Sequence, residues 1–184
     1  MANINPLPEV TASPAVQAAF EKHRTQYNAR ITNMKATLAH SLPAFEIYME
    51  WYRLYDSMKA ILGERLAYLY AYSISKGSDC PLCTTFFRKI IIDNGERPED
   101  IRFTPHEQLI MEFGSGLSLH HGKTDPALFK EVSRHYTIPQ VVDLIAFAGQ
   151  MIATNVFANA TETDIDDYLQ PYLSFNQNTS SHGQ

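Results

Sequence analysis

Cysteine is scarce in this sequence of 184 residues, which contains only two. Both lie in one motif, Cys80-Pro81-Leu82-Cys83. Two cysteines placed at random in a chain of this length would lie three residues apart in only about 1% of cases. The spacing therefore indicates that the two thiols act together, and the motif is the strongest functional signal in the sequence.

Charged residues are also few, and neither sign is in large excess. They make up 19% of the chain, below the usual quarter, whereas the hydrophobic share of 45% is ordinary. This balance excludes disorder for the bulk of the chain and suits a single globular domain. The formal net charge of -5 argues against nucleic-acid binding, which needs basic residues to contact the phosphates.

Long hydrophobic runs are absent as well. The longest candidate, Val141 to Ala153, is interrupted by Asp143, Gly149 and Gln150, so no membrane span is predicted. The first ten residues lack the basic and apolar regions of a signal peptide. We therefore expect a cytoplasmic protein. Thiols stay mostly reduced in that compartment, so a CxxC pair there favours redox chemistry or metal binding over a structural disulfide.

A helical pattern is present almost throughout. Capping residues and early prolines predict helix starts at Ser13-Pro14, Ser41-Leu42-Pro43, Thr104-Pro105, Asp125-Pro126 and Thr137-Ile138-Pro139. Apolar residues recur at helical spacing over 16–38 and 45–55, and the dense segment 62–74 predicts a buried helix. A long apolar helix is expected over 141–158. No segment alternates with period two, so the predicted fold class is all-α.

These patterns divide the chain into three parts. We expect an extended N-terminal segment over residues 1–12, one all-α domain over 13–173 and a mobile polar tail over 174–184.

The CxxC pair is predicted to lie at a helix start, with Ser78 and Asp79 as candidate capping residues. Two cysteines three positions apart share a helix face, and the first-turn N–H groups and helix dipole favour thiolate over thiol. One thiolate can attack a peroxide or disulfide, and the other can resolve the product as an intramolecular disulfide. Asp79 opposes ionisation of Cys80, because a nearby carboxylate disfavours a second negative charge.

The cysteine pair also allows three other interpretations. The cysteines could be two small buried hydrophobic residues on a core helix. A thioredoxin-like fold would need a βαβ context, which the sequence lacks. A structural zinc site would need two further ligands, and the seven histidines show no H-x3-5-H pairing, so no metal is expected.

Three further segments are predicted to be helical and flank the CxxC helix in the sequence: Asn33 to Ser41, Tyr48 to Trp51 and Gln140 to Asn155. With the CxxC helix they resemble the carboxymuconolactone decarboxylase/alkylhydroperoxidase D-like (AhpD-like) superfamily, over roughly residues 15–170. The resemblance implies an AhpD-like helical bundle in which Cys83 is the attacking thiol and Cys80 resolves it.

The resemblance also implies a reaction and partners. It implies a peroxidase or oxidoreductase that reduces a hydroperoxide or a partner's disulfide and is reduced again by an external dithiol. It implies no organic cofactor, and a homo-oligomer such as a dimer, trimer or hexamer.

The sequence departs from this family at the residues that activate the thiol. Phe87 stands where the family's peroxidases have a histidine, and Tyr68 stands about where they have a glutamate. The proton relay must come from other residues, and the candidates are Glu64, Tyr68, Tyr72, His106, His120 and His121. Arg88 lies about 140° round the helix from Cys83, so it supplies either a positive potential or an ion pair.

Two rival functions follow from this departure. The chain could be a non-catalytic interaction module that has kept the fold and lost the relay. It could also be a lyase of the carboxymuconolactone decarboxylase type, although no set of acid–base residues for that reaction is identifiable.

Overall fold

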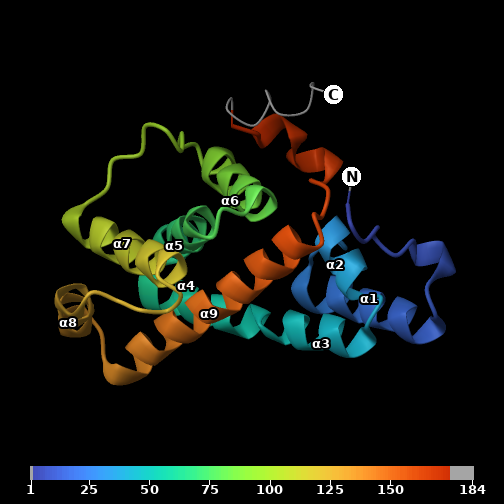
Figure 1. The fold of residues 1–184 in the computed structure, drawn as a ribbon, viewed down its shortest axis with the longest axis horizontal. Coiled ribbons are helices and arrows are strands. Elements are labelled where there is room, and N and C mark those ends of the chain that lie inside the picture. Colours follow the sequence, from blue (N-terminus) through green and yellow to red (C-terminus); the bar gives the residue numbers. More distant parts are fainter. Residues whose placement is uncertain (1, 175–184) are drawn as a thin grey trace.

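The computed structural model describes residues 2–174, and all regular structure within them is helical (Figure 1). The elements are η1 (Glu9–Thr11), α1 (Pro14–Tyr27), α2 (Asn33–Leu38), α3 (Leu42–Glu50), α4 (Tyr52–Leu62), α5 (Glu64–Gly77), α6 (Pro81–Asp93), α7 (Pro105–Leu119), α8 (Pro126–His135), α9 (Ile138–Ala160) and η2 (Asp167–Tyr172). The predicted all-α fold is confirmed. The predicted polar tail lies outside the described residues, except for Ser174.

Side-chain caps begin most helices where the sequence predicts them. At α7, the Thr104 hydroxyl accepts the Glu107 backbone N–H at 3.2 Å, and the Glu107 carboxylate accepts the Thr104 N–H at 2.8 Å. The Asp125 carboxylate caps α8 by accepting two backbone N–H groups, at 2.6 and 3.2 Å. These bonds satisfy N–H groups that the first turn of a helix leaves without an intrahelical acceptor.

Two apolar stripes of the sequence are each divided between two helices. The stripe over 16–38 breaks where Asn28 ends α1 in the left-handed region at φ 47°, and α2 begins only at Asn33. The stripe over 45–55 breaks at Trp51, between α3 and α4. On both sides of Asn28 the helices pack into one cluster of buried side chains, so the apolar spacing continues across that break. At Trp51, Tyr52 packs against the same cluster as α3, whereas Leu54 and Tyr55 pack against a different one.

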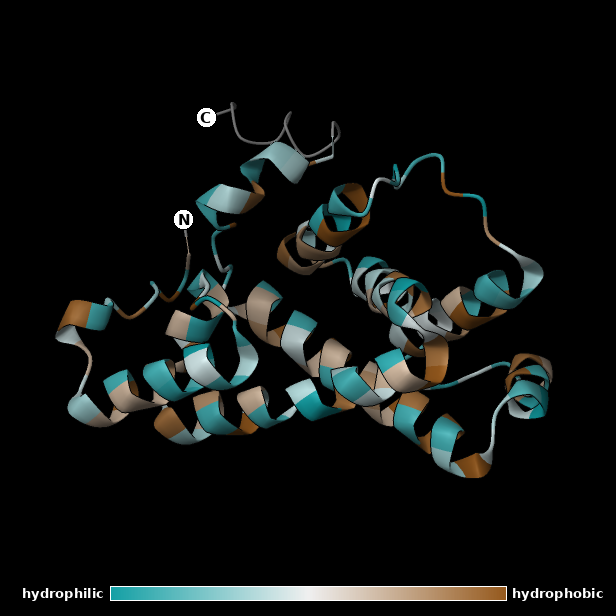
Figure 2. Cartoon of the chain, turned by 180° about the vertical axis from the view of Figure 1, so that it is seen from behind, coloured by the Kyte–Doolittle hydropathy of each residue, from teal (hydrophilic) through white to brown (hydrophobic). Residues whose placement is uncertain are grey.

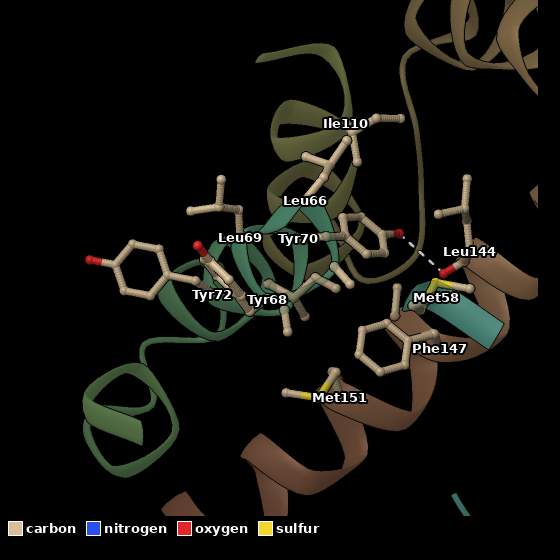
Figure 3. Close-up of a cluster of buried hydrophobic side chains, with 14 of the residues drawn as sticks. Met58, Leu66, Tyr68, Leu69, Tyr70, Tyr72, Ile110, Leu144, Phe147 and Met151 are labelled. Carbon is tan, nitrogen blue, oxygen red and sulfur yellow. Dashed lines mark hydrogen bonds between the residues drawn. The ribbon is translucent and has the colours of Figure 1, made fainter. Parts of the chain in front are cut away.

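The centre of the core is α5, whose residues 66–75 are all buried. It packs against α4, α6, α7 and α9. Tyr70 is fully buried, and its hydroxyl donates a hydrogen bond to the Leu144 carbonyl of α9 at 3.1 Å (Figure 3). A second cluster joins α1, α2 and α3, where the Phe20 and Phe45 rings meet edge to face at 5.3 Å.

The long helix α9 connects the two clusters. It contacts α4 to α8, and Leu144, Phe147 and Met151 lie on its buried face. Within the described residues it is also the one helix long and apolar enough to cross a membrane, with 39% of that window buried. Brown and teal residues alternate along the other long helices, as expected for helices with one buried face (Figure 2).

A close approach between α5 and α7 leads to a stability prediction. A Cβ added at Gly114 would lie 2.6 Å from the Tyr70 ring and 2.8 Å from the Ser73 hydroxyl, whereas one at Gly116 would meet no atom within 4 Å. We expect Gly114→Ala to lower the free energy of unfolding by about 1–3 kcal/mol. Gly116→Ala should raise it by about 0.5–1 kcal/mol, because alanine favours the helix. Urea unfolding of both variants checks the pair, and equal effects would contradict the packing described.

Candidate active site

The cysteine motif begins α6 with an unusual cap. Cys80 itself is the N-cap, and the backbone N–H of Cys83 donates to its Sγ with an N···S distance of 3.3 Å. Pro81 occupies the first helical position, where its missing N–H costs no hydrogen bond. The prediction that Ser78 or Asp79 caps this helix is wrong, because the chain turns once more before α6 begins, with Asp79 at φ 48°.

The turn before α6 is attached to α9 and α7 by polar side chains. The Asn155 side-chain amide donates to the Ser78 hydroxyl at 2.9 Å, and that hydroxyl lies 2.5 Å from the hydroxyl of Ser118. The Asn159 amide donates to the carbonyls of Ser78 and Asp79, each at 3.2 Å. These bonds fix Cys80 relative to α9. Sequence reasoning missed them, although a polar asparagine within an apolar helix was a usable signal.

Both thiols are free and buried, with exposed fractions of 1% for Cys80 and 7% for Cys83. The pKa of Cys80 is lowered, chiefly by the hydrogen bond from the Cys83 thiol and also by the backbone N–H groups of Leu82 and Cys83. Burial and the Asp79 carboxylate oppose this shift, as expected for Asp79. The pKa of Cys83 is raised well above its usual value, because its proton serves Cys80 and because it is buried.

These opposite shifts mean that Cys80 ionises before Cys83. The start of the helix favours a negative charge on the first sulfur, and the Cys83 thiol donates its hydrogen bond toward it. The start of α6 thus favours a thiolate, as the sequence predicts. The cysteine whose pKa it lowers is Cys80, not Cys83. That Cys83 attacks the substrate stays a prediction from the resemblance.

Cys83 faces a cavity of about 430 Å³, and Cys80 is not among the lining residues. We call this cavity the aromatic pocket, after the rings in its wall: Tyr48, Trp51, Tyr52, Tyr55, Phe86, Phe87, Phe147 and Tyr168. They come from α3, the α3–α4 junction, α4, α6, α9 and η2, which surround it together with residues 28–35. Its described lining contains no histidine or glutamate. Phe87, at the position of the family's histidine, is part of this apolar wall.

Arg88 turns away from the pocket and forms an ion pair. Its Nη1 donates to Glu99 at 2.6 Å, and its Nε donates to the Tyr172 carbonyl at 2.9 Å. The side chain is 10% exposed, and it joins α6 to the loop before α7 and to η2. Of the two roles expected for Arg88, the contacts fit the ion pair.

The structure does not bring Glu64 or His106 to the cysteines. Glu64 is exposed at the start of α5, whereas the Cys80 N–H donates to the Ser75 carbonyl near the other end of that helix, about 17 Å away along its axis. His106 Nε2 lies 2.8 Å from the Tyr136 hydroxyl, and its ring contacts His135. Its described partners therefore lie at the end of α8.

The remaining relay candidates have other partners or face solvent. The Tyr68 hydroxyl donates to Glu96 at 3.0 Å, and Tyr72 hydrogen bonds with Arg88. His120 and His121 are exposed where α7 ends. None of the candidates is among the residues that line the aromatic pocket.

Comparisons with known proteins identify the fold. No family model matches the sequence, and no curated protein matches it. The apo crystal structure of the debrominase Bmp8 superposes with a TM-score of 0.75 and 16% identity, covering 92% of this chain and 95% of that one. A cysteine-to-alanine variant of Bmp8 in complex with 2,3,4-tribromopyrrole gives the same TM-score and identity, with 94% of that chain covered.

A third structure is similar over slightly less of the chain. It is an uncharacterized peroxidase-related protein from Silicibacter sp. TM1040, with a TM-score of 0.65, 14% identity and coverage of 89% and 91% of the two chains. The chain has an AhpD-like fold. At these identities the likeness concerns the fold, and the AhpD-like bundle expected from the sequence is confirmed at that level.

The opposite pKa shifts lead to a prediction about the two single-cysteine variants. In Cys83→Ser, Cys80 keeps the backbone N–H of residue 83 and gains a hydroxyl donor, so its thiolate should form below the ordinary thiol pKa of about 8.5. In Cys80→Ser, Cys83 remains buried and should ionise only above that value. Thiolate ultraviolet absorbance against pH measures both. The same midpoint in the two variants, or the reverse order, would contradict the assignment of the charge to Cys80.

Proposed function

We propose that this protein is a thiol oxidoreductase whose two cysteines reduce a substrate bound in the aromatic pocket. The supporting observation is that the two free cysteines are placed differently. Cys83 faces the cavity, and Cys80 caps α6, whose first turn favours a thiolate on Cys80. The leading substrate class is a hydroperoxide, or the disulfide of a partner protein. The AhpD-like fold, shared with a debrominase and a peroxidase-related protein, supports this class of chemistry.

The sulfurs can supply the proton transfer that the family assigns to a histidine. The Cys80 thiolate accepts the Cys83 proton, and the resulting Cys83 thiolate attacks the terminal peroxide oxygen. The O–O bond breaks, the alkoxide takes the proton from Cys80 and leaves as the alcohol, and Cys83 becomes a sulfenic acid. The Cys80 thiolate then attacks the Cys83 sulfur, which forms the disulfide and releases hydroxide, protonated to water.

The balance requires an external reductant. Two thiols and one hydroperoxide give one disulfide, one alcohol and one water. A second dithiol must return the two electrons before another turnover, and the pair needs no organic cofactor or metal for this chemistry.

Oxidation with one equivalent of an organic hydroperoxide tests the proposal. Mass spectrometry should show the loss of two hydrogen atoms and a Cys80–Cys83 disulfide in the unmodified chain. Cys83→Ser should abolish turnover with a dithiol donor, and Cys80→Ser should accumulate sulfenic acid at Cys83, trapped by dimedone. Free thiols after oxidation, or full turnover by Cys83→Ser, would refute it and favour the non-catalytic module. Lactone decarboxylation that survives loss of both cysteines would favour the lyase.

A second candidate reaction is reductive dehalogenation of an apolar ring. The observation that favours it is the aromatic wall in front of Cys83, together with the likeness to a debrominase solved with a tribrominated pyrrole. The dithiol would give two electrons, a C–H bond would replace a C–Br bond, and bromide and a proton would be released. Bromide release from a bromopyrrole, without turnover of hydroperoxides, would select this reaction.

Self-association and location also belong to the proposal. We expect a homo-oligomer in the cytoplasm. Ile138, Val142 and Val156 are exposed along α9, at 82%, 57% and 60%, and offer an apolar surface for a second copy. Light scattering should give more than one chain per particle, and Val142→Glu with Val156→Glu should reduce that number. A monomeric unmodified chain would contradict this expectation.

A further inference from the structure

The part of the aromatic pocket that α2 supplies contains a buried lysine. Lys35 is 6% exposed, and its ammonium donates hydrogen bonds to the Arg30 carbonyl and to His23 Nε2, both at 2.9 Å. It also lies 5.3 Å from the centre of the Tyr52 ring. An ammonium has three protons, so two of them are accounted for by these acceptors.

His23 accepts this bond because it is neutral. Burial, with the Lys35 charge next in size, lowers the pKa of His23 to about 4. The histidine therefore binds the lysine without balancing its charge. The Lys35 charge must be balanced by another group.

The described residues provide only part of that balance. None of their ion pairs includes Lys35 or Arg30, which both line the pocket, although Arg30 stacks on the Tyr168 ring at 4.1 Å. Asp166 is the carboxylate in the lining, and its Oδ1 accepts the Asn33 backbone N–H at 2.9 Å. Two cations and one carboxylate leave this part of the pocket with a net positive charge.

The same lining contains a side-chain oxygen that has no hydrogen-bond donor. Gln150 Oε1, from α9, is buried without a hydrogen bond. Ligand pockets combine an apolar wall with a few polar groups that orient the ligand, and unpaired buried groups are costly unless a ligand satisfies them. The bonds to His23 and Arg30 would let Lys35 join α1 to the α1–α2 connection. That structural role alone does not explain why the lysine lines the cavity or why this part of it has a net positive charge.

We propose that the aromatic pocket binds a ring-bearing organic acid, with its carboxylate on Lys35 and its ring among the aromatic side chains. Its reactive end then lies against Cys83, and that part of the inference rests on the proposed function. Binding of the acid does not depend on the thiols. A cavity of about 430 Å³ suits a small aromatic acid, since ligand pockets typically have about 300–1,000 Å³.

The only tryptophan of the chain, Trp51, lines the pocket and reports on its occupancy. The probes are 4-bromobenzoate and its neutral analogue 4-bromobenzamide, whose bromine quenches tryptophan fluorescence. The protein carries Cys80→Ser and Cys83→Ser, so that no reaction accompanies binding. We expect the benzoate to bind about tenfold or more tightly than the amide, as expected for a charge-assisted hydrogen bond.

Two variants of this protein test the role of the lysine. Lys35→Met should bring the ratio of the two affinities close to one. Lys89→Met is the matched control, because Lys89 also lines the pocket but already pairs with Asp93, and it should keep the ratio. Equal affinities for the benzoate and the amide in the protein that retains Lys35 would overturn the proposal. A preference for the benzoate that survives Lys35→Met would also overturn it.

A pH series on the Lys35-containing protein keeps the test decisive if Lys35→Met does not fold. Burial lowers the pKa of Lys35 to about 8, so the preference for the benzoate should fall as the pH rises through that range. The neighbouring His23 stays neutral there, and burial raises the pKa of Tyr52 to about 12. The other charged groups that act on Lys35 are Arg30 and the Asp166 carboxylate, whose pKa is raised by burial. A preference for the benzoate that does not change with pH would overturn the proposal that Lys35 binds the acid. The proposed thiol chemistry would still stand, because peroxide turnover by the unmodified cysteines is measured separately.

Discussion

The candidate site depends on the hydrogen bond that begins α6. The backbone N–H of Cys83 donates to the sulfur of Cys80, so the sulfur that caps the helix also belongs to the thiol whose pKa is lowered. The same bond keeps the second cysteine one turn further along, where it faces the pocket. Asn155 and Asn159 hold the turn before it against α9, so the sulfur pair has a fixed position relative to the helix that supplies Phe147 to the pocket wall.

Phe87 stands where the AhpD-like resemblance leads us to expect a histidine, and its surroundings suit an apolar side chain. A histidine at that position would be a titratable group among buried aromatic side chains, where burial disfavours its charged form. With phenylalanine there, no histidine stands beside Cys83 in the described lining, and the proposed reaction assigns proton transfer to the two sulfurs themselves. The acidic and basic groups expected to assist, Glu64 and His106, are occupied in other parts of the fold or exposed.

Much of the fold could be predicted because helix starts depend on local chemistry. A capping side chain followed by proline is readable from a few adjacent residues, as at Ser13, Thr104 and Asp125. The breaks at Asn28 and Trp51 could not be found from apolar spacing, because apolar side chains on both sides of each break keep the helical spacing and pack into the interior. Of the site, the sequence could predict the dithiol. The pocket wall combines residues from 28 to 169, and no local pattern shows that Lys35 lies in it.

The cap of α6 has a consequence for how the helix start responds to oxidation. Serine, threonine, asparagine and aspartate begin helices better than other residues, and a good cap contributes about 1 kcal/mol. Cys80 is 1% exposed and packs in an apolar cluster with Leu82, Ala158 and Leu169, where a serine would bury its hydroxyl. One sulfur atom therefore both accepts the first-turn N–H and fills the core. A change in its oxidation state would act on the start of the helix as well as on the thiol.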